Sequence, residues 1–492
     1  MSINSLQSAM TGLKVAQRSL DAVSRNIANV TTDGYTRKTL PVESVFAAGY
    51  EIGVKFGELQ RNVNSAMQRD FWNQISVASS LSTAESYLDR IQSLHGAPDD
   101  ESSVAADITR LGNVFGQLVG TPESTILQTE AMTAARNVAG DLNRLSNNLN
   151  TLRNDTQKDI SGAVGTINTA LTNIARINQS IAQEVHLGRP ASELKDQRDL
   201  AVKSLAEQVD ISFFTRGDGV LVVQTASGRL LADDQAHQLH FSPTPLSPNT
   251  FHPDSAAGVH LDRPVTGPDL ANEELGGRLG ALLKLRDETF PQQQAQVDEL
   301  AHKMAQRFDA QGLRLFTDET GTVPADVAGG YVGFASRIQV NELIEADPTL
   351  VRDGTAGPAG SAGSTTIIRR VVDFALGPQQ NDDPATPHPA FRTTGLGPDG
   401  SVATGLPAQA TLEDYSRNLI SRQSEMHSYA TSELDFQTGY RETLEKRLLD
   451  DSGVDLDQEV AKLQELQAAY AASAKMISTL QDLFDKLLAA IR

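Results

Sequence analysis

The sequence predicts a mainly α-helical, elongated, multidomain protein with β-rich insertions. A terminal coiled-coil domain is expected to adjoin a rod domain of long helices. Long proline-free segments repeat apolar residues every three or four positions, which is the spacing of one helix face. Aromatic residues make up only 5% of the chain, which suits long helices better than a dense aromatic core. At 492 residues the chain is long enough for several domains.

The C-terminal stretch 456–491 is expected to be one helix of about 54 Å, at about 1.5 Å per residue. No Gly or Pro follows Gly453, and Asp455 with Gln458 forms a plausible N-cap with a reciprocal partner. An apolar period of 3.5 residues favours a partner helix alongside. The seam consists of Leu456, Val460, Leu463, Tyr470, Ala474, Ile477, Phe484, Leu488 and Ile491, with Leu466, Leu480 and Leu487 on its flank.

The expected partner is the N-terminal helix, which carries a seam of the same kind. Gln17 and Ser24 interrupt this seam, and small or aliphatic residues follow its flank. Two ordinary amphipathic helices packed on a globular core are the alternative, but such helices usually have a broader apolar stripe. The seam residues are Ile3, Leu6, Met10, Leu13, Leu20 and Ile27, and the flank residues are Ala9, Ala16, Val23 and Val30.

Between the termini, helices alternate with two insertions. The segment 123–185 lacks proline and is long enough for a coiled coil or helical rod, with a possible bend near Gly162 and Gly165. Period-two alternation and Gly-containing turns predict strands in the first insertion. The expected strands are 51–56, 211–214, 219–224 and 229–232, and the other expected helices are 71–94, 191–209, 279–290, 292–312 and 411–449.

The second insertion, 322–410, is rich in Gly, Pro, Ala and Thr. Its candidate strands are 330–334 and 365–374, and it is expected to be a loosely patterned surface domain or a partly mobile loop. The predicted domains are 1–40 and 455–492 for the two halves of the coiled coil, 41–205, 275–321 and 411–454 for the rod, and 206–274 and 322–410 for the insertions.

Composition excludes several kinds of protein. The net charge of −20, without a Lys/Arg cluster, makes nucleic acid an unlikely partner. The absence of cysteine excludes disulfides, thiolate zinc sites and a cysteine nucleophile. No run of about 18 apolar residues occurs, and the N-terminus lacks the features of a cleaved secretory signal. If the protein leaves the cell, it is expected to use a route that removes no such peptide.

No catalytic, cofactor-binding or metal-binding residue is predicted. The glycine pattern of 395–400 resembles a dinucleotide-binding motif, but no strand precedes it and Pro398 lacks a backbone donor. Only His237 and His240 are closely spaced among the histidines of the first insertion, and neither lies in a helical pattern. Solvated loop histidines are therefore the better interpretation of His237, His240, His252 and His260.

The exit of the first helix, residues 28–37, has the residues of a C-cap followed by a turn. It also resembles the shared N-terminal segment of bacterial flagellar rod, hook and hook-associated proteins. Segments 452–459, 466–475 and 196–199 are similar to the hook-associated members at the hook–filament junction. The motif residues are Ala28, Asn29, Thr32, Gly34, Tyr35 and Arg37.

This resemblance implies a structural axial subunit joining hook to filament, whose paired terminal helices assemble into a ring. It also implies contacts with hook protein and the next hook-associated protein, type III export into the flagellum, and an export chaperone on the C-terminal helix. A hook, rod or filament subunit is the nearer alternative, and a secreted coiled-coil wall hydrolase is the more distant one. The expected chaperone-binding residues are Leu463, Leu466, Tyr470, Ile477, Leu480 and Phe484.

Overall fold

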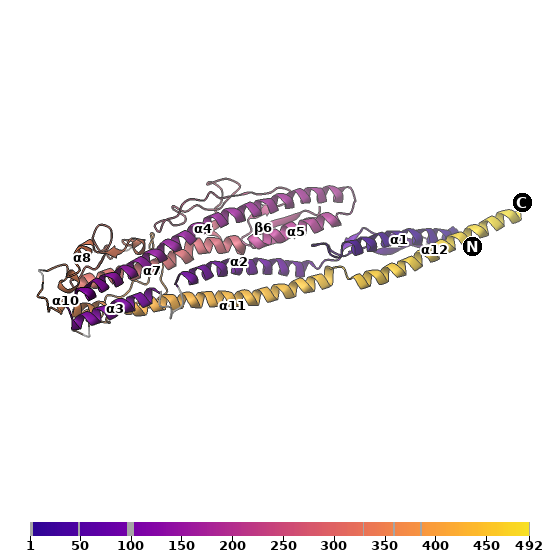
Figure 1. The fold of residues 1–492 in the computed structure, drawn as a ribbon. Coiled ribbons are helices and arrows are strands. Elements are labelled where there is room, and N and C mark those ends of the chain that lie inside the picture. Colours follow the sequence, from indigo (N-terminus) through magenta and orange to yellow (C-terminus); the bar gives the residue numbers. More distant parts are fainter. Residues whose placement is uncertain are drawn as a thin grey trace.

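The computed structural model describes residues 3–47, 50–95, 103–327, 329–357, 360–383 and 386–491. The molecule is elongated, and both termini lie at the same end (Figure 1). A narrow arm contains α1 (Ile3–Ala28) and α12 (Leu456–Ile491). The remaining helices and both insertions form a wider body. The arm and body correspond to the predicted coiled-coil and rod domains, whose exact boundaries stay predictions.

The body is built from long helices with identifiable caps. The longest, α4 (Thr125–His186), begins where the Ser124 side chain accepts a hydrogen bond from Leu127 N, and it continues unbroken through both glycines near its middle. Thr411 caps α11 (Leu412–Ser452) in the same way. Helix α3 (Val104–Gly120) was not predicted. The others are α2 (Ser65–His95), α5 (Ser192–Gln208), α6 (Gly277–Lys284) and α7 (Phe290–Ala310), with a π-helical turn, η2 (Leu285–Thr289), joining α6 to α7.

One hydrophobic core runs through the body. Its aromatic centre links three elements, since Phe115 of α3, Phe308 of α7 and Phe316 are fully buried. Their rings meet edge to face, with centroids 6.0 Å apart for Phe115–Phe308 and 5.4 Å for Phe308–Phe316. Burial of this extent makes hydrophobic packing the main stabilising term for the body.

The first insertion has the three strands that the sequence predicts. They form an antiparallel sheet in the order β5-β6-β7, and a two-stranded pair, β8-β9, follows. Asn178 of α4 fixes the sheet to the helix: its Nδ2 donates to Leu221 O at 2.8 Å, and its Oδ1 accepts from Leu221 N at 3.0 Å. The elements are β5 (Ile211–Thr215), β6 (Leu221–Thr225), β7 (Leu230–Ala232), β8 (Leu239–His240), β9 (His260–Leu261) and a 3-10 turn, η1 (Leu270–Asn272).

The second insertion corrects the prediction. The expected strand at 330–334 is a turn in which Gly333 has a φ of 71°, and the expected strand at 365–374 is helical. Phe334, Ile338 and Val371 are completely buried, so most of the described segment is packed on the body. Its elements are η3 (Phe334–Ser336), β11 (Gln339–Val340), α8 (Glu342–Ala346), α9 (Leu350–Asp353), α10 (Thr366–Arg370) and the π-helical turn η4 (Val371–Ala375). Strand β11 pairs with β10 (Phe316–Thr317), which precedes the insertion.

Polar side chains of α7 attach this insertion. The Asp298 carboxylate accepts hydrogen bonds from Gly333 N at 2.7 Å and Ala335 N at 2.9 Å. The neighbouring Glu299 accepts from Tyr331 OH at 2.5 Å. Burial raises the pKa of Asp298 to about 7. The attachment of the insertion therefore depends on two carboxyl groups of α7, which the Gly/Pro-rich sequence of the insertion itself does not predict.

Two small sheets adjoin the arm. The pair β1 (Lys38–Thr39) and β4 (Gln60–Arg61) lies where the arm meets the body. The hairpin β2 (Val42–Ala47) and β3 (Tyr50–Phe56) packs on α1. The predicted turn at 48–49 lies outside the described residues. None of the helices in the described ranges is long and apolar enough to cross a bilayer.

Candidate functional site

The arm is a pair of helices, as the sequence predicts, and the structure shows that the pair is antiparallel. Gly12 of α1 lies against Ser473 of α12, and Asn26 of α1 hydrogen-bonds Glu459 of α12. A Cβ at Gly12 would be 3.6 Å from Ser473 Oγ, so small residues allow the helices to approach closely. The N-cap of α12 also agrees with prediction, because Asp455 accepts from Asp457 N and Gln458 N, and Gln458 Nε2 donates back.

The face that each helix buries differs from the expected seam. On α1 the buried apolar residues are Ala9, Ala16, Ala22 and Val23, and all of them except Ala22 were assigned to the flank. On α12 the most buried apolar side chain is Leu480, also a flank residue, at 9% exposure. Small flank residues let the two helices pack closely, and this close contact turns the larger seam residues aside.

The seam residues are therefore divided. Leu6, Leu13, Leu20, Ile27, Leu463 and Ile477 are half-buried, while Met10, Val460, Tyr470 and Phe484 are exposed by 40–47%. The side chains of Ile3, Leu488 and Ile491 lie outside the described residues.

Among its described residues, the arm consequently leaves seven large apolar side chains at least 40% exposed, six on α12 and one on α1, here together called the free stripe. It spans both helices, and towards its C-terminal end α12 extends past α1 (Figure 1). A monomer rarely leaves such a group of side chains uncovered unless another molecule binds there. The free stripe consists of Met10, Leu456, Val460, Tyr470, Met476, Leu483 and Phe484.

The predicted chaperone-binding residues divide between the two faces of α12. Leu463, Leu466 and Ile477 are half-buried, Leu480 is buried, and Tyr470 and Phe484 are exposed. A partner that covers all six residues would have to separate α12 from α1, whereas a partner on the free stripe would not.

The motif loop after α1 has a clear structural basis. Asn29 Nδ2 donates to Arg25 O at 2.9 Å, and Thr32 N donates to Asn29 O at 2.9 Å, which closes the helix end. Gly34 has a φ of 72°, and a Cβ there would lie 2.6 Å from Leu200 of α5. Only glycine meets both requirements. Ala28 at the helix end is exposed.

The loop leads into a polar cluster, here called the joint, which connects arm and body. At its centre Asn26 is 1% exposed and makes four hydrogen bonds. Its Nδ2 donates to Lys38 O and Glu459 Oε2, and its Oδ1 accepts from Lys38 N and Tyr35 OH, all at 3.0 Å. One amide thus ties α1, β1 and α12 together, and every donor and acceptor of that amide is used.

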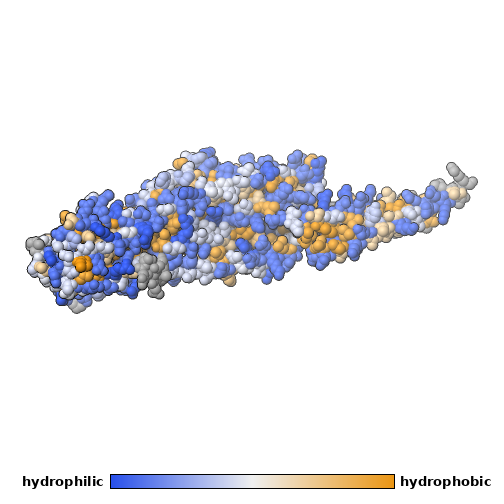
Figure 2. Space-filling model, in the orientation of Figure 1, coloured by the Kyte–Doolittle hydropathy of each residue, from blue (hydrophilic) through white to orange (hydrophobic). Residues whose placement is uncertain are grey.

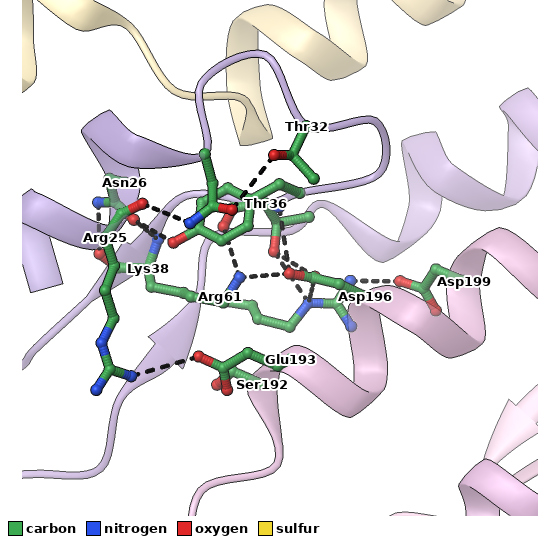
Figure 3. Close-up of polar contacts among 12 residues, drawn as sticks. Arg25, Asn26, Thr32, Thr36, Lys38, Arg61, Ser192, Glu193, Asp196 and Asp199 are labelled. Atoms are coloured by element: carbon green, nitrogen blue, oxygen red, sulfur yellow. Dashed lines mark hydrogen bonds and ion pairs between the residues drawn. The ribbon is translucent and has the colours of Figure 1, made fainter.

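The second part of the joint reaches the body (Figure 3). The fully buried Lys38 ammonium forms an ion pair with Asp196 of α5, and Thr36 Oγ1 donates to the same carboxylate at 2.6 Å. Arg61 Nε lies 2.9 Å from Asp196 Oδ1, and its guanidinium also pairs with Asp199. Buried charges are tolerated because each has a partner.

The third part holds the two long C-terminal helices. Arg37 Nε donates to Glu459 Oε1 at 2.7 Å, and Arg37 N donates to Ser452 O at 2.8 Å. A Cβ on Gly453 would be 2.4 Å from Leu449 O, so this position between α11 and α12 favours glycine. Burial raises the pKa of Tyr35 to about 12, so its hydroxyl remains a donor to Asn26.

Sequence reasoning identified Tyr35, Arg37 and the segment 196–199, but it did not assign Asn26, Lys38, Arg61 or Glu459 to a site. A signal was present for two of them. Asn26 continues the three-four spacing of Ala9, Ala16 and Val23, and Glu459 has the same relation to Leu463 and Leu466. A polar residue in an otherwise apolar contact row often sets helix register.

The arrangement holds helices and does not suggest catalysis. Among the described residues, no group of three or more His, Asp or Glu is placed to hold a metal ion. His237 and His252 pair with Asp262 and Asp269, at 3.0 and 2.8 Å. His260 Nδ1 lies 3.1 Å from Gly267 O. Their contacts are within the insertion, and the interpretation as solvated loop histidines is wrong for His252, whose side chain is only 8% exposed. The glycine pattern 395–400 is an irregular turn in which Leu396 is buried.

Comparison with known proteins agrees with this architecture. Residues 88–322 match the flagellar hook-associated protein FlgK helical domain. Residues 447–490 match the C-terminal region of the flagellar basal body rod FlgEFG proteins, and residues 6–36 match the flagella basal body rod protein family. The last two segments contain most of the arm and part of the joint, including Asn26 and Glu459.

Relatives that match over nearly their full length are also flagellar hook-associated proteins. Flagellar hook-associated protein 1 of Salmonella typhimurium is 25% identical over 98% of this chain and 98% of its own length. That of Bacillus subtilis is 21% identical over 98% and 97%. A solved structure, the flagellar hook junction protein FlgK from Burkholderia pseudomallei, is 24% identical with a TM-score of 0.44, over 52% of this chain and 46% of that one. The chain is thus similar to flagellar hook-associated proteins 1 over nearly its whole length, and three of its segments match models of flagellar protein families.

Proposed function

We propose that this chain is a structural subunit of the bacterial flagellum, at the junction of hook and filament, and that it assembles through its arm. The observation that carries the assembly mode is the free stripe, a group of exposed apolar side chains on two helices that share few buried large side chains. Association would cover the stripe and supply burial that the monomer lacks. The family is structural, and the chain is not an enzyme.

The same proposal includes the finer partners. Copies of the chain form a ring, with hook protein on one side and the next hook-associated protein on the other. The subunit reaches this position by flagellar type III export without a cleaved signal peptide. Support for these steps comes from the names of the relatives and from the joint, which would fix the arm relative to the body.

A charge on the free stripe tests the assembly mode. Tyr470→Asp should leave monomer unfolding unchanged, because Tyr470 is 40% exposed. It should abolish incorporation and motility, since an aspartate would have to be desolvated in the assembled interface. Gln464→Asp, an exposed position on the same helix, is the matched control and should remain motile. Motile cells with normal filaments carrying Tyr470→Asp would refute this mode of assembly.

A chaperone on α12 is the remaining part of the proposal. Before assembly the free stripe is exposed to the cytoplasm, and a groove-binding partner that reads three-four spaced anchors would cover it. Deleting 456–492 should abolish chaperone binding, whereas deleting 1–30 should leave it nearly intact. Calorimetric titration of the two truncations distinguishes the outcomes. Equal loss of affinity from both would mean that the chaperone reads the paired helices.

A further inference from the structure

A groove of about 840 Å³ lies beside the joint, between the motif loop, α2, α5 and the α11–α12 connection. Its lining is mixed, with charged residues such as Asp33, Lys203 and Glu445. Three apolar side chains on it are accessible: Val30 is 39% exposed, Leu200 37% and Leu449 61%. Figure 2 shows apolar surface gathered at this point, where the arm meets the body. The joint uses none of these three side chains.

The groove is continuous with the free stripe. Leu456 and Val460, exposed by 47% and 41%, follow the connection that forms one wall of the groove. If the free stripe is covered by neighbouring copies, as proposed above, the groove lies at the end of the same interface. Its occupant is then most simply part of a second copy of this chain.

The β2–β3 hairpin supplies a complementary feature. Val42 and Phe46 are four positions apart in β2, so their side chains point to the same face of the strand. They are exposed by 48% and 67%. A two-stranded hairpin has little stability of its own in water, and this one packs only on α1 among the described elements. An apolar ridge of this kind is typical of a contact that forms on assembly.

The end of the hairpin that carries Phe46 does not reach the groove of its own chain. Val54 N donates to Thr11 Oγ1 at 3.4 Å, and Gly53 lies on the same residue, so the end with Phe46 is beside the first half of α1. The groove begins at Val30, which is about 28 Å farther along at about 1.5 Å per residue. A ridge on one part of a molecule and a groove on another make a head-to-tail contact, which generates rings or helical arrays.

We propose that Val42 and Phe46 of one copy pack into the joint groove of a neighbouring copy, against Val30, Leu200 and Leu449. This inference rests on the proposed function and specifies its subunit contact. It also gives Gly34 of the motif loop a local role, since this glycine allows the loop to lie over Leu200 beside the groove.

Because the chain has no cysteine, disulfide trapping has no background. The variant Phe46→Cys with Leu449→Cys should give covalent dimers after mild oxidation of purified flagella, and none in the purified monomer. Each single variant should give none. A disulfide needs Cα atoms about 4 to 7 Å apart, so a bond within one chain is excluded by the separation along α1. The matched control is Leu343→Cys with Leu449→Cys, because Leu343 is 62% exposed but lies on α8 at the far end of the body.

Normal incorporation of the 46/449 pair without dimers would overturn the contact while leaving the proposed function intact. Dimers from the 343/449 pair as well would also overturn it, since the trapping would then be indiscriminate. If the cysteine variants do not incorporate, a photoreactive benzoyl-phenylalanine at position 46 keeps an aromatic ring there. Its cross-links should map to residues 30–36, 200 or 448–455 of another copy, and a map elsewhere would refute the proposal. Absence of the unmodified chain from the junction would instead refute the proposed function.

Discussion

The body and the arm are both built from long helices, yet they are stabilised differently. The body buries large side chains completely, such as Leu111, Phe115 and Phe308 at 0% exposure. The arm buries mainly alanines and leaves leucine, tyrosine and phenylalanine at its surface. An alanine contact removes far less apolar area from water than a leucine or phenylalanine contact. The body is therefore a complete folding unit, whereas the arm gains much of its stability on association.

The joint differs from both. It connects α1, β1, β4, α5, α11 and α12 through an amide, paired charges and backbone hydrogen bonds, which depend on direction as well as proximity. A hydrophobic contact between arm and body would permit sliding, but hydrogen bonds of 2.6–3.0 Å hold one geometry. A subunit that joins two tubes must present its arm at a defined angle, and the joint is suited to that requirement.

The largest expected effect comes from the body core. Phe308→Ala removes a buried ring between Phe115 and Phe316 and should cost roughly 3 to 5 kcal/mol of unfolding free energy. Chemical denaturation of the monomer measures this. Leu480→Ala in the arm is the counterpart and should leave the main transition unchanged. Similar losses from both would show that arm and body unfold together, which would break the comparison.

Acidity should act on the body through Asp298. Its pKa is raised to about 7, so between about pH 4 and 7 the folded protein keeps a proton that the unfolded chain releases. The contribution of this carboxyl to stability therefore falls as pH rises through that window. Asp298→Asn should lose less stability than wild type between pH 5 and 7, measured by denaturation at each pH.

The control for that measurement is Asp309→Asn, on the same helix but paired with Arg314 at the surface. It should keep the wild-type slope. An unchanged slope in Asp298→Asn would mean that the buried carboxylate is ionised throughout, with its two backbone donors sufficient to hold the charge.

The joint should give an intermediate effect. Asn26→Ala leaves Glu459 and the Lys38 backbone without their partner, which costs about 1 to 3 kcal/mol for the buried groups. The loss should appear as detachment of the arm, measured by faster cleavage near Ser452 in limited proteolysis. Asn29→Ala removes only a hydrogen bond of the exposed helix end and is the matched control. Equal cleavage of the two variants would assign Asn26 no special role.

The smallest perturbation requires no substitution. Hydrogen exchange on a verified monomer should show residues 3–30 and 456–486 exchanging much faster than the core of α4 and α7, since few large side chains are buried in the arm. In assembled flagella the same segments should become protected. Slow exchange of both arm helices in the monomer would contradict the comparison directly.

The sequence by itself determined the long helices other than α3, the pairing of the two ends, the cap at Asp455 and the strands of the first insertion, because these follow from local spacing and side-chain chemistry. It identified the motif loop but not the joint, whose members Asn26, Lys38, Asp196 and Glu459 meet only after distant segments fold together. Tertiary structure also decided which face of α1 is buried. The apolar periodicity predicts which side of α1 is apolar. The close approach of the two helices, which the alanines and Gly12 permit, decides that the small residues at the margin of this apolar side are the ones buried. Tertiary packing also makes residues 366–375 of the second insertion helical. Ile368 and Val371 are buried in this segment, which contacts α3 and α7, and this long-range packing outweighs the strand preference of β-branched residues.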